Sequence, residues 1–145
     1  MITRRDAREW AVQMLFEVDL NPPKDLDVLL VEFWSHREVS KKQRVFAERL
    51  VHGVVDNREE LDAALHTYAE NWDVRRMGVL ERNVMRMALF ELLHCEDIPP
   101  VVTINEAVDI AKYFSTRESG RFVNGILDRV RKTLDRPARQ GKNGD

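Results

Sequence analysis

Apolar residues recur along most of the chain at the three- and four-residue spacing that is typical of amphipathic helices. The clearest case lies within the first twenty residues, where Thr3 and Asp6 form a plausible N-terminal cap and Asn21-Pro22-Pro23 ends the pattern. One face of this helix is expected to be buried. It consists of Ala7, Trp10, Ala11, Met14, Leu15 and Val18.

The same spacing predicts two more helices before residue 70. A short one covers about residues 26–34. Ser40 and Gln43 then form a capping box, and one long helix is expected over about 41–69, with a bend near Gly53.

Three further helices are predicted in the second part of the chain. Residues 78–94 are apolar on most sides, which is typical of a central helix. Thr103 and Glu106 are expected to cap the next helix, and the last one begins near residue 118. Because no segment alternates apolar and polar residues over the length of a β-strand, the pattern indicates an all-α protein with about six main helices.

The composition agrees with one compact domain and changes the picture mainly through charge. The 145 residues carry a net charge of −2, with 43% apolar residues. Residues 1–10 and 112–142 together hold 12 Lys and Arg against 5 Asp and Glu, whereas 11–111 hold 11 against 19. If the two ends meet in space, they form a basic face that suits a polyanion such as nucleic acid; otherwise they are two solvated tails.

Several classes of protein are disfavoured by the sequence. It has no apolar run long enough to span a membrane and no signal peptide, so we expect a cytoplasmic protein. Cys95 is the only cysteine, and we expect it to pack or to lie on the surface. The four histidines lack metal-ligand spacing, and no phosphate loop or nucleophile motif is present. We therefore expect a binding protein, with no cofactor, rather than an enzyme.

The stretch GRFVNGILDRVRK, residues 120–132, contains a glycine inside an amphipathic helix. Glycine costs up to about 1 kcal/mol relative to alanine there, so something is expected to approach Gly125 closely. Helical geometry alone favours a neighbouring helix; the alternative is RNA, with Phe122 stacking on a base, Asn124 reading a base edge and Arg117 and Arg121 holding phosphates.

Phe16 is also unusual, because it is a large aromatic residue outside the apolar stripe of its helix. At about 100° per residue it lies beside the buried stripe of the first helix, on the same side as Arg5 and Arg8. Packing at the edge of the core is the commoner explanation for such a residue, and contact with a partner is the other.

Three stretches identify a family resemblance: RRDAREWAVQMLFEVDL, RNVMRMALFELL and IPPVVTINEAVDIAKYFSTRESGRFVNGILDRV. They resemble the NusB family of bacterial transcription antitermination factors over nearly the whole chain. The resemblance implies an all-helical fold of two small bundles packed into one domain. It also implies that the protein pairs with NusE, a ribosomal protein, and binds the box A element of ribosomal RNA leader transcripts within the RNA polymerase antitermination complex.

The resemblance also implies site residues. The arginine-rich N-terminus of the family falls on Arg4, Arg5 and Arg8, and its FVNG motif falls on residues 122–125. Its partner-binding surface is similar to a face that contains Phe16 and Glu81, to which we add Glu118. The resemblance favours RNA as the partner of the last helix and supports a basic face at the two chain ends.

Two departures from the family pattern affect RNA binding in opposite directions. Asp6 interrupts the arginine run and should weaken phosphate binding, and Arg117, where the family usually has an acidic residue, should partly offset it.

The expected organisation is one domain over residues 1–136, with halves of about 1–70 and 71–136 and a disordered tail over 137–145. Two alternatives stay open: an RNA-binding domain related to ribosomal RNA cytosine methyltransferases, and a helical protein-protein adaptor. The absence of a methyl-donor segment favours a stand-alone factor. Whether the free protein is a monomer or a homo-oligomer is open.

Overall fold

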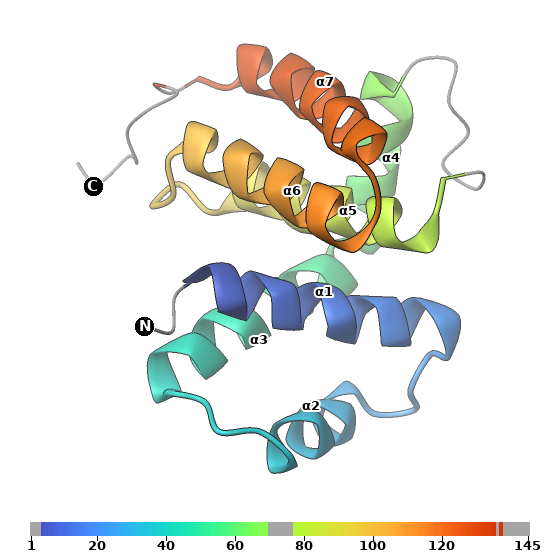
Figure 1. Ribbon diagram of the computed structural model, residues 1–145, viewed down its shortest axis with the longest axis vertical. Helices are drawn as coiled ribbons and strands as arrows, with labels where there is room; N and C mark the ends of the chain where they lie inside the picture. Colours follow the sequence, from blue (N-terminus) through green and yellow to red (C-terminus); the bar gives the residue numbers. More distant parts are fainter. Residues whose placement is uncertain (1–3, 70–76, 136, 138–145) are drawn as a thin grey trace.

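The computed structural model describes residues 4–69, 77–135 and 137, and these form α-helices without a strand (Figure 1). The all-α prediction is confirmed, with one more helix than expected. In chain order the helices are α1 (Arg4–Leu20), α2 (Leu26–Ser35), α3 (Lys41–Asp56), α4 (Arg58–Tyr68), α5 (Val79–His94), α6 (Pro100–Phe114) and α7 (Arg117–Thr133).

The helices form two bundles, one above the other in Figure 1. Helices α1, α2 and α3 make the lower bundle, and α4, α5, α6 and α7 make the upper one. Helix α5 packs against α1 and α3 below it and against α4, α6 and α7 in its own bundle. Its residues Asn83–Leu92 are all buried, which confirms the prediction of a central helix.

The prediction of one long helix over 41–69 is wrong, because the chain turns at Asn57 and forms two helices, α3 and α4. The backbone amide of Asn57 donates to the carbonyl of Gly53 at 3.1 Å, and its side-chain amide donates to the same oxygen at 2.8 Å. Helix α4 then leaves for the upper bundle. The apolar spacing continues across the turn because α3 and α4 both pack on α5. We therefore propose that the boundary between the halves lies at Asn57 rather than near residue 70.

The bend expected near Gly53 lies at Asn57, four residues later, and α3 continues through Gly53. Gly53 is buried inside α3, where a β-carbon would collide with the ring of Phe90. The glycine therefore lets α3 and α5 approach closely.

The prediction that Thr103 and Glu106 cap α6 is also wrong. Helix α6 begins at Pro100. Proline is favourable there because an amide hydrogen in the first turn would have no acceptor within the helix, so its absence costs no hydrogen bond. Thr103 lies inside the helix, buried, and its hydroxyl donates to Glu91 at 2.8 Å. Thr3, the proposed cap of the first helix, and the expected tail from 138 onward lie outside the described residues.

The remaining predictions of the helical pattern agree with the structure. Helices α2, α5 and α7 begin and end within about two residues of the expected positions, and Ser40 caps α3 by accepting from the amide of Gln43. Cys95 is buried. Within the described residues, no helix is long and apolar enough to cross a membrane.

Candidate nucleic-acid interface and partner surface

Helix α7 separates a buried stripe from an open face. Thr116 caps its N-terminus by accepting from the amide of Ser119 at 3.1 Å. The stripe includes Val123 and Ile126 and packs on α6 and α5. On the other side, Asn124 is exposed and Phe122 is half-buried against the core. The aromatic residue therefore lies at the margin between core and solvent.

Gly125 faces open space. A β-carbon built there would have no other atom within 4 Å, leaving aside the backbone of its own helix. At Gly120, one turn earlier, a β-carbon would lie 2.6 Å from the Lys112 side chain of α6. Gly120 therefore explains how the two helices pack, whereas Gly125 seats no helix of this protein. Of the two explanations that the sequence left open, a neighbouring helix is excluded among the described residues.

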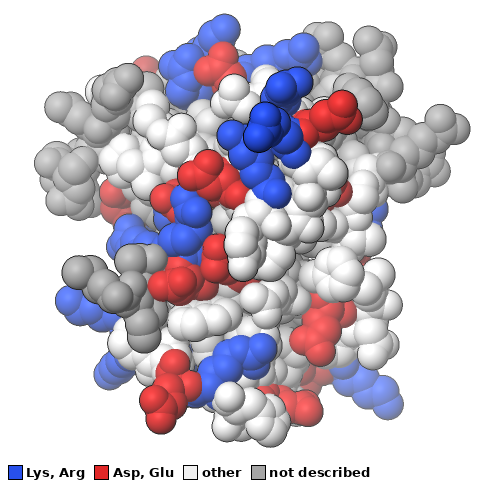
Figure 2. Space-filling view, viewed as in Figure 1, with Lys and Arg blue, Asp and Glu red and all other residues white. Residues whose placement is uncertain are grey.

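Two cations flank this open face. Arg117 and Arg121 are both exposed, and neither forms an ion pair with another described residue. Further along the helix, Asp128 pairs with Arg131 at 2.8 Å and with Lys132 at 3.4 Å. Figure 2 shows Lys and Arg gathered at the level of α7, at the top of the view. The open face of α7 therefore combines an aromatic edge, an amide and two cations that form no ion pair with a described residue.

The N-terminal arginines do not share one environment. Arg4 is exposed, and its guanidinium lies 4.4 Å from the centre of the Phe46 ring. Arg5 is half-buried and pairs with Glu106 and with Asp109 of α6, the second contact at 2.9 Å. Both groups raise the pKa of Arg5, Glu106 by a hydrogen bond most strongly. Arg4 is therefore exposed and forms no ion pair with a described residue, although it interacts electrostatically with Asp97, whereas the charge of Arg5 is neutralised.

Arg8 is not a surface residue, so its prediction as an RNA contact is wrong. Its exposed fraction is 2%, and its guanidinium donates two hydrogen bonds to Glu91, at 2.7 and 2.8 Å. Glu91 is itself 1% exposed and also accepts from Thr103. Arg8 therefore joins α1, α5 and α6 inside the protein and is not available to a phosphate.

The two basic chain ends do not meet as one face. Helix α6 lies between α1 and α7 (Figure 1), and its Glu106 and Asp109 neutralise Arg5 there. In the space-filling view, acidic and basic side chains are interspersed across the middle of this face (Figure 2). The expected single basic face is therefore divided into a strip on α7 and a second patch at the start of α1.

The residues expected to bind a protein partner lie in the last turns of α1 and in the first turns of α5 and α7. Phe16 is 39% exposed, so its position beside the buried stripe is confirmed. Glu81, in the first turn of α5, accepts from the hydroxyls of Ser119 at 2.7 Å and Ser115 at 2.9 Å. Glu118 is exposed in the first turn of α7. The structure thus brings Glu81 and Glu118 together at the turn between α6 and α7.

Glu81 is held in its charged form. Its partial burial would raise the pKa, but the hydrogen bonds from Ser119, from its own backbone amide and from Ser115 outweigh this effect and lower the pKa. Glu81 is therefore a fixed negative charge on this surface.

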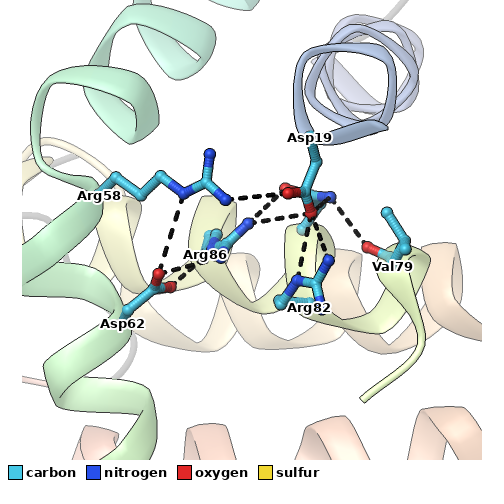
Figure 3. A network of polar contacts seen from close by, with 7 residues as sticks. Asp19, Arg58, Asp62, Val79, Arg82 and Arg86 are labelled. Atoms are coloured by element: carbon cyan, nitrogen blue, oxygen red, sulfur yellow. Dashed lines mark hydrogen bonds and ion pairs between the residues drawn. The ribbon is translucent and has the colours of Figure 1, made fainter. Parts of the chain in front are cut away.

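A polar network behind this surface was missed by the sequence analysis. Asp19, near the end of α1, accepts from Arg82 at 2.7 Å, from Arg58 at 2.9 Å and from Arg86 at 3.2 Å (Figure 3). Arg86 also donates to Asp62 of α4 at 2.6 Å. The network ties α1, α4 and α5 together. The partners are 39 to 67 residues from Asp19 in the chain, so no local motif indicates them.

The environment of Asp19 lowers its pKa. Burial alone would raise it, but hydrogen bonds from Arg82 and Asn83 and the charges of Arg82 and Arg86 outweigh burial. Nothing in the network resembles a metal site: no cluster of three or more His, Cys, Asp or Glu among the described residues is placed to hold an ion. We conclude that it fixes the orientation of α1 against α5.

Comparison with known proteins gives a consistent result. Residues 5–132 match the model of the NusB family. The transcription antitermination protein NusB of Desulforapulum autotrophicum is 47% identical over 137 residues, which cover 92% of this chain and 95% of the relative. That of Methylacidiphilum infernorum is 38% identical over 138 residues, covering 95% and 96%.

Solved structures show the same likeness. T. maritima NusB superposes with a TM-score of 0.83 at 38% identity, over 93% of this chain and 94% of that one. A crystal structure of the antitermination factors NusB and NusE in complex with dsRNA contains a chain that superposes with a TM-score of 0.82. That chain is 27% identical, and the match covers 90% of this chain and 97% of that one.

Proposed function

The chain belongs to the NusB family, and from this premise we propose that it is a transcription antitermination factor. In this role it binds box A RNA of ribosomal RNA leader transcripts together with the ribosomal protein NusE, and so supports ribosomal RNA synthesis within the antitermination complex. The named relatives and the NusB–NusE structure with dsRNA support this role. It acts in the cytoplasm, by binding and without catalysis of its own.

The observation that carries the proposal is the open face of α7. Gly125 has no neighbour that its missing side chain would touch, and Asn124 and Phe122 lie next to it. A half-buried phenylalanine can stack on an RNA base, an amide can read a base edge, and Arg117 and Arg121 can hold phosphates. A gap beside a stacking residue serves a ligand that must approach the helix backbone closely.

The partner surface is proposed to include Glu81 and Glu118, at the N-terminal end of α7, and Phe16 of α1. An exposed aromatic ring and a fixed negative charge both suit a basic protein surface, because the ring supplies contact area and the carboxylate supplies orientation. Phe16 and the open part of α7 belong to different bundles. The proposed RNA contacts on α7 and the proposed partner contact at Phe16 therefore lie on different bundles.

A gel-shift titration with box A RNA, with and without the NusE protein, tests this function. We expect salt-dependent binding by the chain alone and tighter binding when NusE is present. An adaptor without RNA contact would bind NusE and leave the RNA unshifted. A domain of the methyltransferase-related type would bind RNA with an affinity that NusE does not change.

A further inference from the structure

A groove of about 680 Å³ opens at the start of α3, beside the first turn of α1. Its lining includes four cations, Arg4, Lys41, Lys42 and Arg49, and two apolar residues, Val45 and Phe46. None of the described residues that line it is acidic. The groove therefore combines positive charge with an apolar wall, and only Arg4 belongs to the RNA-binding residues assigned above.

Three of the four cations are available to a ligand. Arg49 is engaged, because it donates to both oxygens of Asp97, at 2.7 and 3.1 Å. Lys41 and Lys42 are exposed, and neither forms an ion pair with another described residue. Arg4 lies over the face of the Phe46 ring and, although it interacts electrostatically with Asp97, it forms no ion pair with a described residue. Val45 is 59% exposed beside them.

The position of the two lysines is unfavourable for the isolated protein. They are the first two residues of α3, and no acidic residue occupies that turn. The N-terminus of a helix carries the positive end of the helix dipole, so cations there destabilise the helix and an anion stabilises it. A phosphate bound in the groove would therefore interact favourably with Lys41, with Lys42 and with the end of α3 at once.

We propose that this groove binds the phosphodiester backbone of RNA and extends the RNA path beyond Arg4. The proposal rests on the proposed function, which brings RNA to the N-terminal end of α1. RNA fits better than an acidic protein segment because the groove is continuous with Arg4 and because the exposed Val45 side chain can contact a ribose, whereas the Phe46 ring is buried beneath the Arg4 guanidinium. Phosphates bind to Lys41 and Lys42.

The double variant Lys41→Ala/Lys42→Ala tests this proposal, with box A RNA carrying single-stranded flanks as the probe. Each phosphate contact on single-stranded nucleic acid contributes about 0.7 to the slope of log affinity against log salt. Losing two contacts should reduce the slope by about 1.4 and weaken binding about 25-fold at 0.1 M salt. The melting temperature should stay the same or rise, because two cations leave the positive end of the helix dipole.

Lys24→Glu is the matched control. It changes the net charge by the same two units as the double variant, at an exposed residue in the turn between α1 and α2. We expect the affinity and salt slope of this control to stay close to those of the parent. A loss that is equal in the two variants would reflect total charge and would contradict a site at the groove.

Three results separate failure of this proposal from failure of the proposed function. If Phe122→Ala weakens RNA binding and the lysine variant binds like the parent, the groove proposal is wrong and the function stands. If the parent binds no RNA, both are wrong. If the lysine variant keeps its RNA affinity and loses affinity for the NusE protein, the groove binds protein instead.

Discussion

At the scale of single residues, three arginines within five positions of α1 have different roles. Arg4 offers its charge to solvent, Arg5 is neutralised by α6, and Arg8 is buried against Glu91. Position in the helix explains part of this difference: Arg4 and Arg8 lie one turn apart on the same side of α1, but Arg4 is the exposed first residue, whereas Arg8 lies beside the buried Ala7 and Ala11. The rest depends on Glu91, a buried carboxylate far away in the chain.

Replacing Arg8 by alanine should therefore lower the free energy of unfolding. The change leaves the charge of Glu91 buried without its partner, and we expect a loss of about 3–5 kcal/mol in the free energy of unfolding. Arg4→Ala is the comparison, because it removes an exposed cation: its stability should stay within about 0.5 kcal/mol of the parent while its RNA affinity falls. Denaturant melts of both variants check this, and an Arg8→Ala protein as stable as the parent would contradict the buried pair.

Phe16→Ala tests the partner surface at the same scale. Because the ring is 39% exposed, its removal should cost far less stability than the roughly 3–5 kcal/mol that is typical of a fully buried phenylalanine. Affinity for the NusE protein should fall by about 2 kcal/mol if the ring anchors that interface. Calorimetric titration measures the affinity, and a large loss of stability with unchanged partner affinity would make Phe16 a core residue.

At the scale of helices, the Asp19 network decides how α1 is oriented on α5. Asp19→Asn should destabilise the protein by about 3 kcal/mol at neutral pH, because Arg82 and Arg86 lose a negative partner that is itself buried. Thermal melts give the stability, and Asp25→Asn, at the exposed cap of α2, serves as the control for the chemical change. Equal stability losses in the two variants would contradict a special role for Asp19.

The lowered pKa of Asp19 also predicts how the stability of the parent depends on pH. A carboxylate whose pKa is lower in the folded state stabilises the protein above its unfolded pKa, near 3.9, and this contribution is lost as pH falls below that value. The parent should therefore lose stability below about pH 4 more steeply than Asp19→Asn. Denaturant melts between pH 3 and 7 compare the slopes, and parallel curves would show that Asp19 has an ordinary pKa.

The sequence predicts the helices well where local spacing determines them and poorly where distant contacts do. The stripes of α1, α5 and α7 appear directly in the apolar positions. The turn at Asn57 cannot be predicted from these positions, because both flanking helices pack on α5 and the apolar spacing therefore continues across the turn. Burial of Arg8 requires Glu91, and the open space at Gly125 requires knowing that no other helix lies there. Neither fact is encoded locally.

At the scale of the whole molecule, the basic chain ends form two surfaces rather than one. Helix α6 and its carboxylates separate the strip on α7 from the patch at Arg4 (Figure 1). An RNA that uses both must pass α6, where Arg5 is already paired. The turn between α6 and α7, with Glu81 and Glu118, lies beside the α7 strip and remains free for a protein partner.

The central claim is that the gap at Gly125 receives RNA, and the RNA affinity of Gly125→Leu tests it most directly. The leucine side chain enters open space, so the protein should stay folded and bind NusE normally, yet bind box A RNA at least tenfold more weakly. Gly125→Ala is the matched control: it should be up to about 1 kcal/mol more stable than the parent, since alanine favours the helix. A folded Gly125→Leu protein with the parent's RNA affinity would contradict the account.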